Sequence, residues 1–175
     1  LNGASIDGIK INNGTVYDNI ADFFQGSSVW DNSVSVAGGH KNGSFYLSAS
    51  RFDQTGTIQN TGYDKTTFRF NGEQKFGRLT VGANVAYSVA NTEKTLTSSG
   101  LYSGGGNGTM TALYGWSRSE NMSHWLNEDG TKYRMFPNAA LEDEVENPYW
   151  IINKNKMTDK NERITGAVTA NFEFT

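Results

Sequence analysis

The sequence predicts an all-β fold, specifically a segment of an antiparallel transmembrane β-barrel that contributes about five strands. Several stretches alternate apolar and polar residues with a period of two, as strands with two different faces do. Short and long connections between these stretches also alternate. The 175 residues include 20 Gly, 2 Pro, no Cys and 13% aromatics, a composition that favours strands and turns over helices.

Residues 1–30 are expected to lead into the barrel rather than form a domain of their own. Residues 16–24 (VYDNIADFF) form a helix-like patch that carries Asp18 and Asp22. Three strand candidates follow, at 33–38, 44–52 and 63–74. In each of them apolar side chains are set against serine, threonine or other polar residues at alternate positions.

The clearest strand covers 79–88, and the last covers 164–174. In the former, Leu79, Val81, Ala83, Val85 and Tyr87 alternate with Thr80, Gly82, Asn84, Ala86 and Ser88. In the latter, Ile164, Gly166, Val168, Ala170, Phe172 and Phe174 alternate with Thr165, Ala167, Thr169, Asn171 and Glu173. The same two-sided pattern therefore recurs along the chain.

The connections suggest which rim of a barrel each end of the strands occupies. Residues 40–43 and 76–78 are predicted to be tight turns, whereas 53–62 is longer and 91–159 is very long. Outer-membrane barrels have short periplasmic turns and long extracellular loops. We therefore expect barrel strands at 31–90 and 160–175, separated by an extracellular loop region at 91–159.

Five strands cannot close a barrel, because bacterial single-chain barrels need at least about eight. The open edges of a smaller sheet would leave backbone groups unpaired in lipid. The chain is therefore expected to be a fragment that other strands complete.

The composition argues against several other classes of protein. A net charge of -3 without a basic stripe argues against nucleic acid binding, and the absence of Cys removes thiol catalysis and cysteine zinc sites. Only His40 and His124 are available as histidine bases, and no catalytic motif surrounds them. We expect no enzyme activity, no cofactor and no metal. The acidic run at 142–146 is interpreted as a solvated loop face, 104–108 as a glycine-rich loop tip, and Asn127 to Thr131 as an Asp-Gly turn.

A longer run of residues resembles a known family. The stretch VYDNIADFFQGSSVWDNSVSVAGGHKNGSFYLSASRFDQTGTIQNTGYDKTTFRFNGEQKFGRLTVGANVAYS and the later NPYWIINKNKMTDKNERITGAVTANFEF resemble the start of the barrel in SusC/RagA-type TonB-dependent transporters of Bacteroidetes outer membranes. The resemblance implies an outer-membrane barrel of about 22 strands with an internal plug, importing glycans or peptides. It also implies energy from TonB, acting through parts of the transporter that this sequence lacks, and a SusD-like lipoprotein partner.

In such a barrel, the lumen wall would be formed by Ser48, Ser50, Arg69, Asn84, Thr169 and Asn171. The lipid face or its aromatic girdles would be formed by Phe45, Phe68, Phe70, Tyr87, Phe172 and Phe174. Arg51 does not fit this alternation, since its position points to the lipid. We expect it to extend toward the interface beside Asp53, or a bulge to shift the strand.

The aromatic residues of the long loop are the candidate contacts for a substrate, because flat rings stack on sugars and pack against apolar peptide side chains. The candidates are Tyr102, Tyr114, Trp116 and Trp125. Tyr149 and Trp150, which follow Pro148, are expected to anchor the loop at the membrane interface. Two other functions fit the same pattern: a secreted β-sandwich that binds carbohydrate or acts as an adhesin, and a passive porin.

Overall fold

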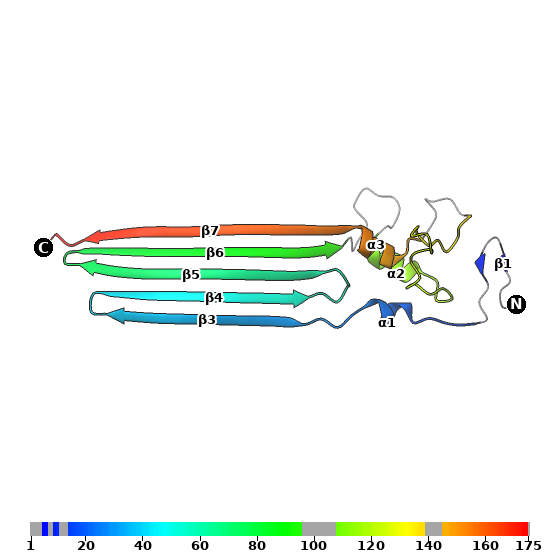
Figure 1. Cartoon of the computed structure of the whole chain (residues 1–175), viewed down its shortest axis with the longest axis horizontal. Helices are drawn as coiled ribbons and strands as arrows, with labels where there is room; N and C mark the ends of the chain where they lie inside the picture. The colour runs from blue at the N-terminus through cyan, green and yellow to red at the C-terminus, as the bar shows by residue number, and fades with distance from the viewer. Residues whose placement is uncertain (1–4, 7–8, 11–13, 96–107, 139–144, 175) are drawn as a thin grey trace. The chain divides into compact units, whose positions relative to one another are not determined.

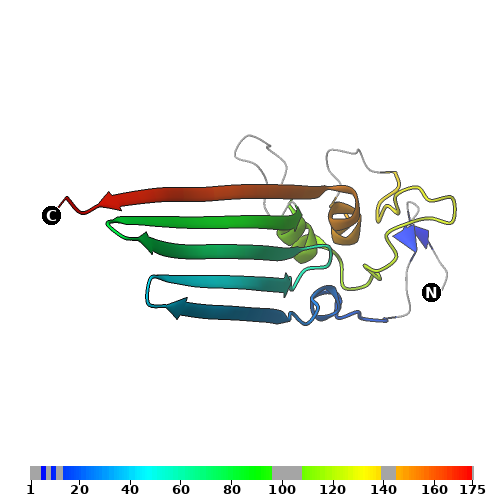
Figure 2. The same ribbon diagram turned by 60° about the vertical axis from the view of Figure 1, so that its left-hand side comes forward.

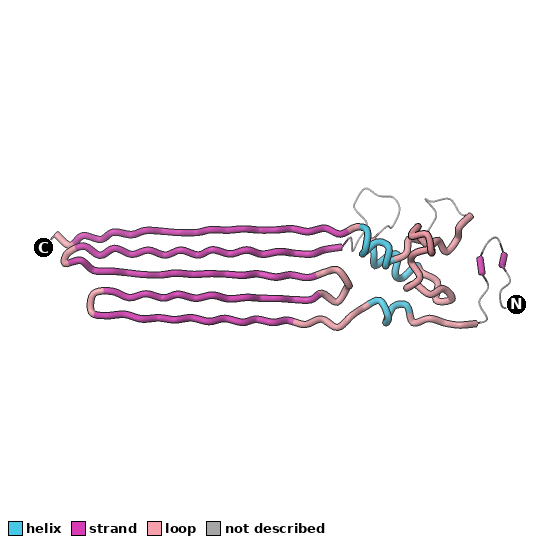
Figure 3. The backbone as a smooth tube through the Cα atoms, in the orientation of Figure 1, coloured by secondary structure: helices cyan, strands magenta, loops and turns pink. Residues whose placement is uncertain are grey.

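The computed structural model describes residues 5–6, 9–10, 14–95, 108–138 and 145–174. These residues belong to two compact units. The loop unit contains Leu1–Gly26, Thr57–Thr61 and Lys94–Met157, and the sheet unit contains Ser27–Gly56, Gly62–Glu93 and Thr158–Thr175. Figure 3 distinguishes the long strands of one unit from the short helices and loops of the other.

The sheet unit is a single antiparallel sheet of five long strands. In chain order they are β3 (Val29–His40), β4 (Gly43–Thr55), β5 (Gly62–Phe76), β6 (Leu79–Thr95) and β7 (Lys156–Phe172). They lie side by side in this same order, so every strand pairs with its neighbour in the chain (Figures 1 and 2). The predicted all-β fold is confirmed at this level.

Each predicted strand is present. The first four reach or pass their predicted bounds, whereas β7 begins at Lys156, well before Ile164, and ends at Phe172, two residues before the predicted end at Phe174. Strand β6 continues past Ser88 because its polar end still pairs with β5, for example Asn91 with Asp64 and Glu93 with Gly62. Cross-strand hydrogen bonds maintain a strand even where alternation of apolar and polar residues has ended. The end of a hydrophobic pattern therefore underestimates the length of these strands.

Two tight turns connect the strands at one end of the sheet, as predicted. His40 pairs directly with Gly43, and the His40 Nδ1 atom accepts a hydrogen bond of 3.0 Å from the Asn42 amide. The turn after Phe76 contains Gly77 at φ 61°. This left-handed backbone conformation is accessible to glycine without a steric penalty.

The register of the sheet separates apolar from polar side chains. Val34 lies opposite Ala49, Ala49 opposite Phe68, and Phe68 opposite Tyr87. Residues that are directly opposite in a ladder point to the same face. The apolar residues therefore form one continuous face, which we call the apolar face, and the alternate residues form the polar face.

The residues that the structure describes form no hydrophobic core on the apolar face. None of the described residues of the sheet unit is buried, and large apolar side chains are widely exposed, Val34 by 70% and Val168 by 78%. Soluble monomers seldom expose a contiguous apolar surface that extends over several strands. Within the described residues, the sheet presents an apolar surface that nothing covers.

Arg51 lies on the apolar face without a bulge, because the ladder runs unbroken through its pairs with Asn32 and Thr66. Its guanidinium group forms ion pairs with Asp53 at 2.6 Å and Asp64 at 3.0 Å, and donates a hydrogen bond to the Thr66 hydroxyl. Of the two alternatives expected for Arg51, the bulge is therefore wrong. A cluster of paired charges accommodates the arginine at the end of the apolar face.

The loop unit contains the buried residues of the described structure. It holds β1 (Ser5–Ile6), β2 (Ile9–Lys10), α1 (Asn19–Phe23), α2 (Thr109–Gly115) and α3 (Pro148–Lys154). Helix α2 packs against α1 and α3. The core consists of Phe23, Leu113, Trp116, Met122, Met135, Tyr149 and Ile152.

Helix α1 confirms the predicted helical patch but is shorter, since Phe24 is already extended. Helices α2 and α3 were not predicted. Helix α3 begins where Pro148 occupies the first turn and the Asn147 side chain caps the Tyr149 amide. Both are standard helix-start signals. None of the helices in the described residues has the length and apolar character that crossing a bilayer requires.

Two buried asparagines hold the backbone of Met122 from both sides. The Met122 amide donates a 3.1 Å hydrogen bond to the Asn19 side chain, and the Met122 carbonyl accepts one of 2.9 Å from the Asn147 side chain. Asn19 also donates to the carbonyls of Ser117 and Glu120. Since buried polar groups need partners, these two amides fix the path of the loop through the core.

Replacing Asn147 with alanine should destabilise the loop unit by about 2 to 4 kcal/mol, because the change removes a helix cap and leaves the Met122 carbonyl buried without that partner. The measurement is amide hydrogen exchange of α3 and of the segment around Met122, which should become at least about tenfold faster. The exposed Asn161 in β7 provides a matched control, and Asn161→Ala should change neither region. Equal exchange rates in Asn147→Ala and Asn161→Ala would contradict the role of Asn147 in holding the Met122 backbone.

Candidate functional site

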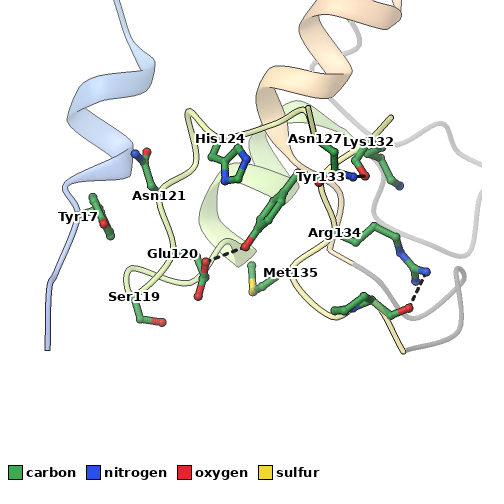
Figure 4. Close-up of a pocket in the computed structure, with 11 residues that line it drawn as sticks. Tyr17, Ser119, Glu120, Asn121, His124, Asn127, Lys132, Tyr133, Arg134 and Met135 are labelled. Atoms are coloured by element: carbon green, nitrogen blue, oxygen red, sulfur yellow. Dashed lines mark hydrogen bonds between the residues drawn. The ribbon is translucent and has the colours of Figure 1, made fainter. Parts of the chain in front are cut away.

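The loop unit contains a cavity of about 640 Å³ that is open to solvent (Figure 4). Its walls combine aromatic, amide and charged side chains. It is lined by Tyr17, Ser119, Glu120, Asn121, His124, Asn127, Lys132, Tyr133, Arg134, Met135 and Pro137.

Hydrogen bonds between distant segments form the walls of this cavity. The Tyr17 amide donates to the Arg118 carbonyl at 2.8 Å, which joins the segment before α1 to the loop. On another side, the predicted Asp-Gly turn is confirmed, since Gly130 has φ 80° and its amide donates to the Asn127 carbonyl. The side-chain Nδ2 of Asn127 then donates to the Lys132 carbonyl at 3.1 Å and closes the turn.

Tyr133 is the most constrained polar group of the cavity. Its ring stacks on His124 with 4.3 Å between the centroids, and its hydroxyl donates to Glu120 at 3.1 Å (Figure 4). Burial, followed by the negative charge and hydrogen bond of Glu120, raises the pKa of Tyr133 to about 12. Tyr133 therefore remains a hydrogen-bond donor at physiological pH.

The two cations of the cavity are differently engaged. Lys132 forms an ion pair with Glu146 at 3.2 Å. Arg134 donates to the Pro137 carbonyl at 3.0 Å (Figure 4). With Glu120, they provide charged donors and an acceptor beside aromatic rings. This arrangement is suited to binding a polar ligand by hydrogen bonds.

The predicted substrate contacts are not brought together at this cavity. Tyr114 on α2 is 69% exposed, whereas Trp116 is only 4% exposed and donates through Nε1 to the Glu120 carbonyl. Trp125 packs on the core with its ring edge-on to Trp150, at 6.2 Å between centroids. None of these three lines the cavity, and Tyr102 lies outside the described residues. Their contact with a substrate stays a prediction.

Sequence reasoning missed Tyr17, Glu120 and Arg134 as cavity residues. No local motif marks them, because the cavity is formed by chain segments about a hundred residues apart. The Asp-Gly turn was the one signal in the sequence that pointed to part of this wall.

Tyr149 is a core residue rather than an interface anchor. It is 9% exposed, its ring packs edge-on against Phe23 at 5.3 Å, and its hydroxyl donates to the Asp22 carbonyl. Burial, then the charge of Asp22, raises the pKa of Tyr149. The expectation failed because Pro148 begins a helix that turns Tyr149 inward.

The other candidate motifs of the loop are only partly described. Residues 104–107 and 139–144 lie outside the described residues, while Gly108 precedes α2 as its N-cap and Glu146 pairs with Lys132. In the described part of the chain, no three acidic or histidine side chains are arranged to hold a metal ion.

The polar face of the sheet unit is the second candidate site. Ser48 lies opposite Arg69, Ser50 opposite Thr67, and Asn84 opposite Asn71. The hydroxyl of Thr169 on β7 lies 3.5 Å from the Gly82 carbonyl on β6. The residues predicted to form a lumen wall therefore share one face.

Comparison with models of protein families finds no match for this chain, and comparison with curated proteins finds no significant match.

Tyr133 should titrate near pH 12, whereas an ordinary tyrosine titrates near 10. The measurement is the tyrosinate absorbance of the unmodified protein minus that of the Tyr133→Phe variant. Glu120→Gln should lower the pKa of Tyr133 but not fully, because burial is the larger cause. The folded state binds the proton more tightly than the unfolded state, so this contribution to stability is present below pH 10 and is lost as the pH rises toward 12. A difference curve centred near 10 would contradict the buried Tyr133–Glu120 contact.

Proposed function

We propose that the sheet unit is part of the wall of an outer-membrane transport barrel of the SusC/RagA type, which imports glycans or peptides. The observation that carries the proposal is the two-sided sheet: its apolar face is exposed without a covering layer, and its other face is polar. In a barrel the apolar face would meet lipid and the polar face would line the lumen.

The height of the apolar face supports this proposal. From Leu79 to Val89, strand β6 advances about 34 Å at roughly 3.4 Å per residue. With a strand tilt of about 40–45°, this length corresponds to roughly 25 Å along the membrane normal, the height of the apolar band of outer-membrane barrels. At one end of this face lies the charge cluster of Arg51, Asp53 and Asp64, where headgroups would begin.

The open edges of the sheet support the same function. Strands β3 and β7 each have a neighbour on one side only, so their outer backbone groups are available for pairing. In the proposed barrel, further strands pair with both edges, the tight turns face the periplasm, and the long loop faces outside. A SusD-like lipoprotein would cover the barrel, and TonB would act through a plug.

Two single-cysteine variants test the assignment of the faces, since the chain has no cysteine of its own. Val85→Cys and Asn84→Cys are adjacent in β6 and lie on opposite faces. After reconstitution in lipid vesicles, a fluorophore at Val85→Cys should be quenched by nitroxide-labelled lipid tails and shielded from iodide. A fluorophore at Asn84→Cys should show the opposite pattern. Equal quenching of both by iodide, with no effect of the lipid quencher, would sink the proposal and favour a water-soluble sandwich.

A second experiment separates an energised importer from a passive porin. Uptake of a candidate glycan or peptide by cells that carry the complete barrel is measured with and without functional TonB. An importer should lose most of its uptake without TonB. Unchanged uptake would assign the barrel to the passive class.

A further inference from the structure

Three basic side chains lie on the polar face and form no ion pair among the described residues. Lys65 and Arg69 lie on β5, opposite Ala90 and Ala86 of β6. On β7, the backbone bond from Glu173 to Arg78 and the contact of Thr169 with the Gly82 carbonyl fit one register. Continued along β7 without a bulge, this register puts Arg163 opposite Ser88. At about 3.3 Å per residue and about 4.8 Å between strands, the three Cα atoms are roughly 12 to 13 Å apart. We call these three residues the basic patch.

The charges of the basic patch are not neutralised within the described structure. All three side chains are exposed, and none forms an ion pair among the described residues. Other cations of the sheet do have partners: Arg51 pairs on the opposite face and Lys75 pairs with Glu173. The patch is therefore positive on a chain whose net charge is -3.

A hollow of about 310 Å³ lies beside two of these cations, on the same face. It is lined by Asp31, Ser50, Phe52, Tyr63, Lys65, Thr67 and Arg69. The rings of Phe52 and Tyr63 lie 5.8 Å apart at 59° and form one end of it. The small side chains of Ala86, Ser88 and Ala90 on β6 leave room around the cations. The hollow thus combines an aromatic surface, hydroxyl groups, the carboxylate of Asp31 and two cations that form no ion pair among the described residues.

We propose that the basic patch and the adjoining hollow bind an anionic oligosaccharide, with sulfate or carboxylate groups between Lys65, Arg69 and Arg163. A sugar ring stacks on Phe52 and Tyr63, and Ser50 and Thr67 bond to ring hydroxyls. A neutral glycan would leave three charges without partners. The inference rests on the proposed function, in which this face lines the lumen, and it names the substrate class.

The test measures binding of dextran sulfate and of uncharged dextran of equal length to the intact protein in lipid nanodiscs. Dextran sulfate should bind at least about tenfold more tightly, and salt should weaken its binding. Lys65→Gln, Arg69→Gln and Arg163→Gln should each weaken binding about fivefold or more. Lys75→Gln, which removes a paired cation of the same sheet, should leave it within about twofold.

Phe52→Ala separates sugar recognition from attraction of any polyanion. It should weaken dextran sulfate binding about fivefold and leave binding of poly-glutamate unchanged. No preference for dextran sulfate, an equal effect of Lys75→Gln, or no effect of Phe52→Ala would overturn the inference. The quenching pattern at positions 84 and 85, measured on the same nanodiscs, shows whether a negative result concerns the ligand or the barrel. If Val85→Cys is quenched by lipid and Asn84→Cys by iodide, only the proposed anionic ligand is wrong and the barrel proposal stands.

Discussion

The unbroken register of the sheet is the constraint on which the other features depend. From β3 to β6 the cross-strand pairs run without a gap, and no extra residue interrupts the ladders. Because side chains alternate with a period of two, a slip of one residue in a single strand would mix its apolar and polar residues with the opposite faces of its neighbours. The apolar face and the basic patch both exist only in this register.

The two units are stabilised by different physics. The loop unit has a conventional core in which two buried asparagines fix the Met122 backbone and three short helices supply apolar side chains. The sheet unit buries none of its described residues and is maintained by its ladder of hydrogen bonds. Such a sheet needs a further medium or further strands against its apolar face, which is why its environment dominates the proposed function.

The charges of the sheet fit the two proposed surroundings, which are lipid at the apolar face and a water-filled lumen at the polar face. On the apolar face, Arg51 is compensated by Asp53 and Asp64, an arrangement that the proposed contact with lipid would require. On the polar face, Lys65 and Arg69 form no ion pair with any residue that the structure describes, which water tolerates and an anionic ligand would exploit.

The sequence alone determined the five strands, the two tight turns and the two faces, because alternation along a strand is local and is preserved when neighbours pair. It also determined the Asp-Gly turn before Thr131. Only the tertiary structure decided which loop residues are buried and which line the cavity. Trp116 became a core residue, Tyr149 turned inward, and Tyr17, Glu120 and Arg134 came together around a cavity. Contacts such as that between Asn19 and Met122 join residues about a hundred positions apart, and no periodicity in either segment encodes them.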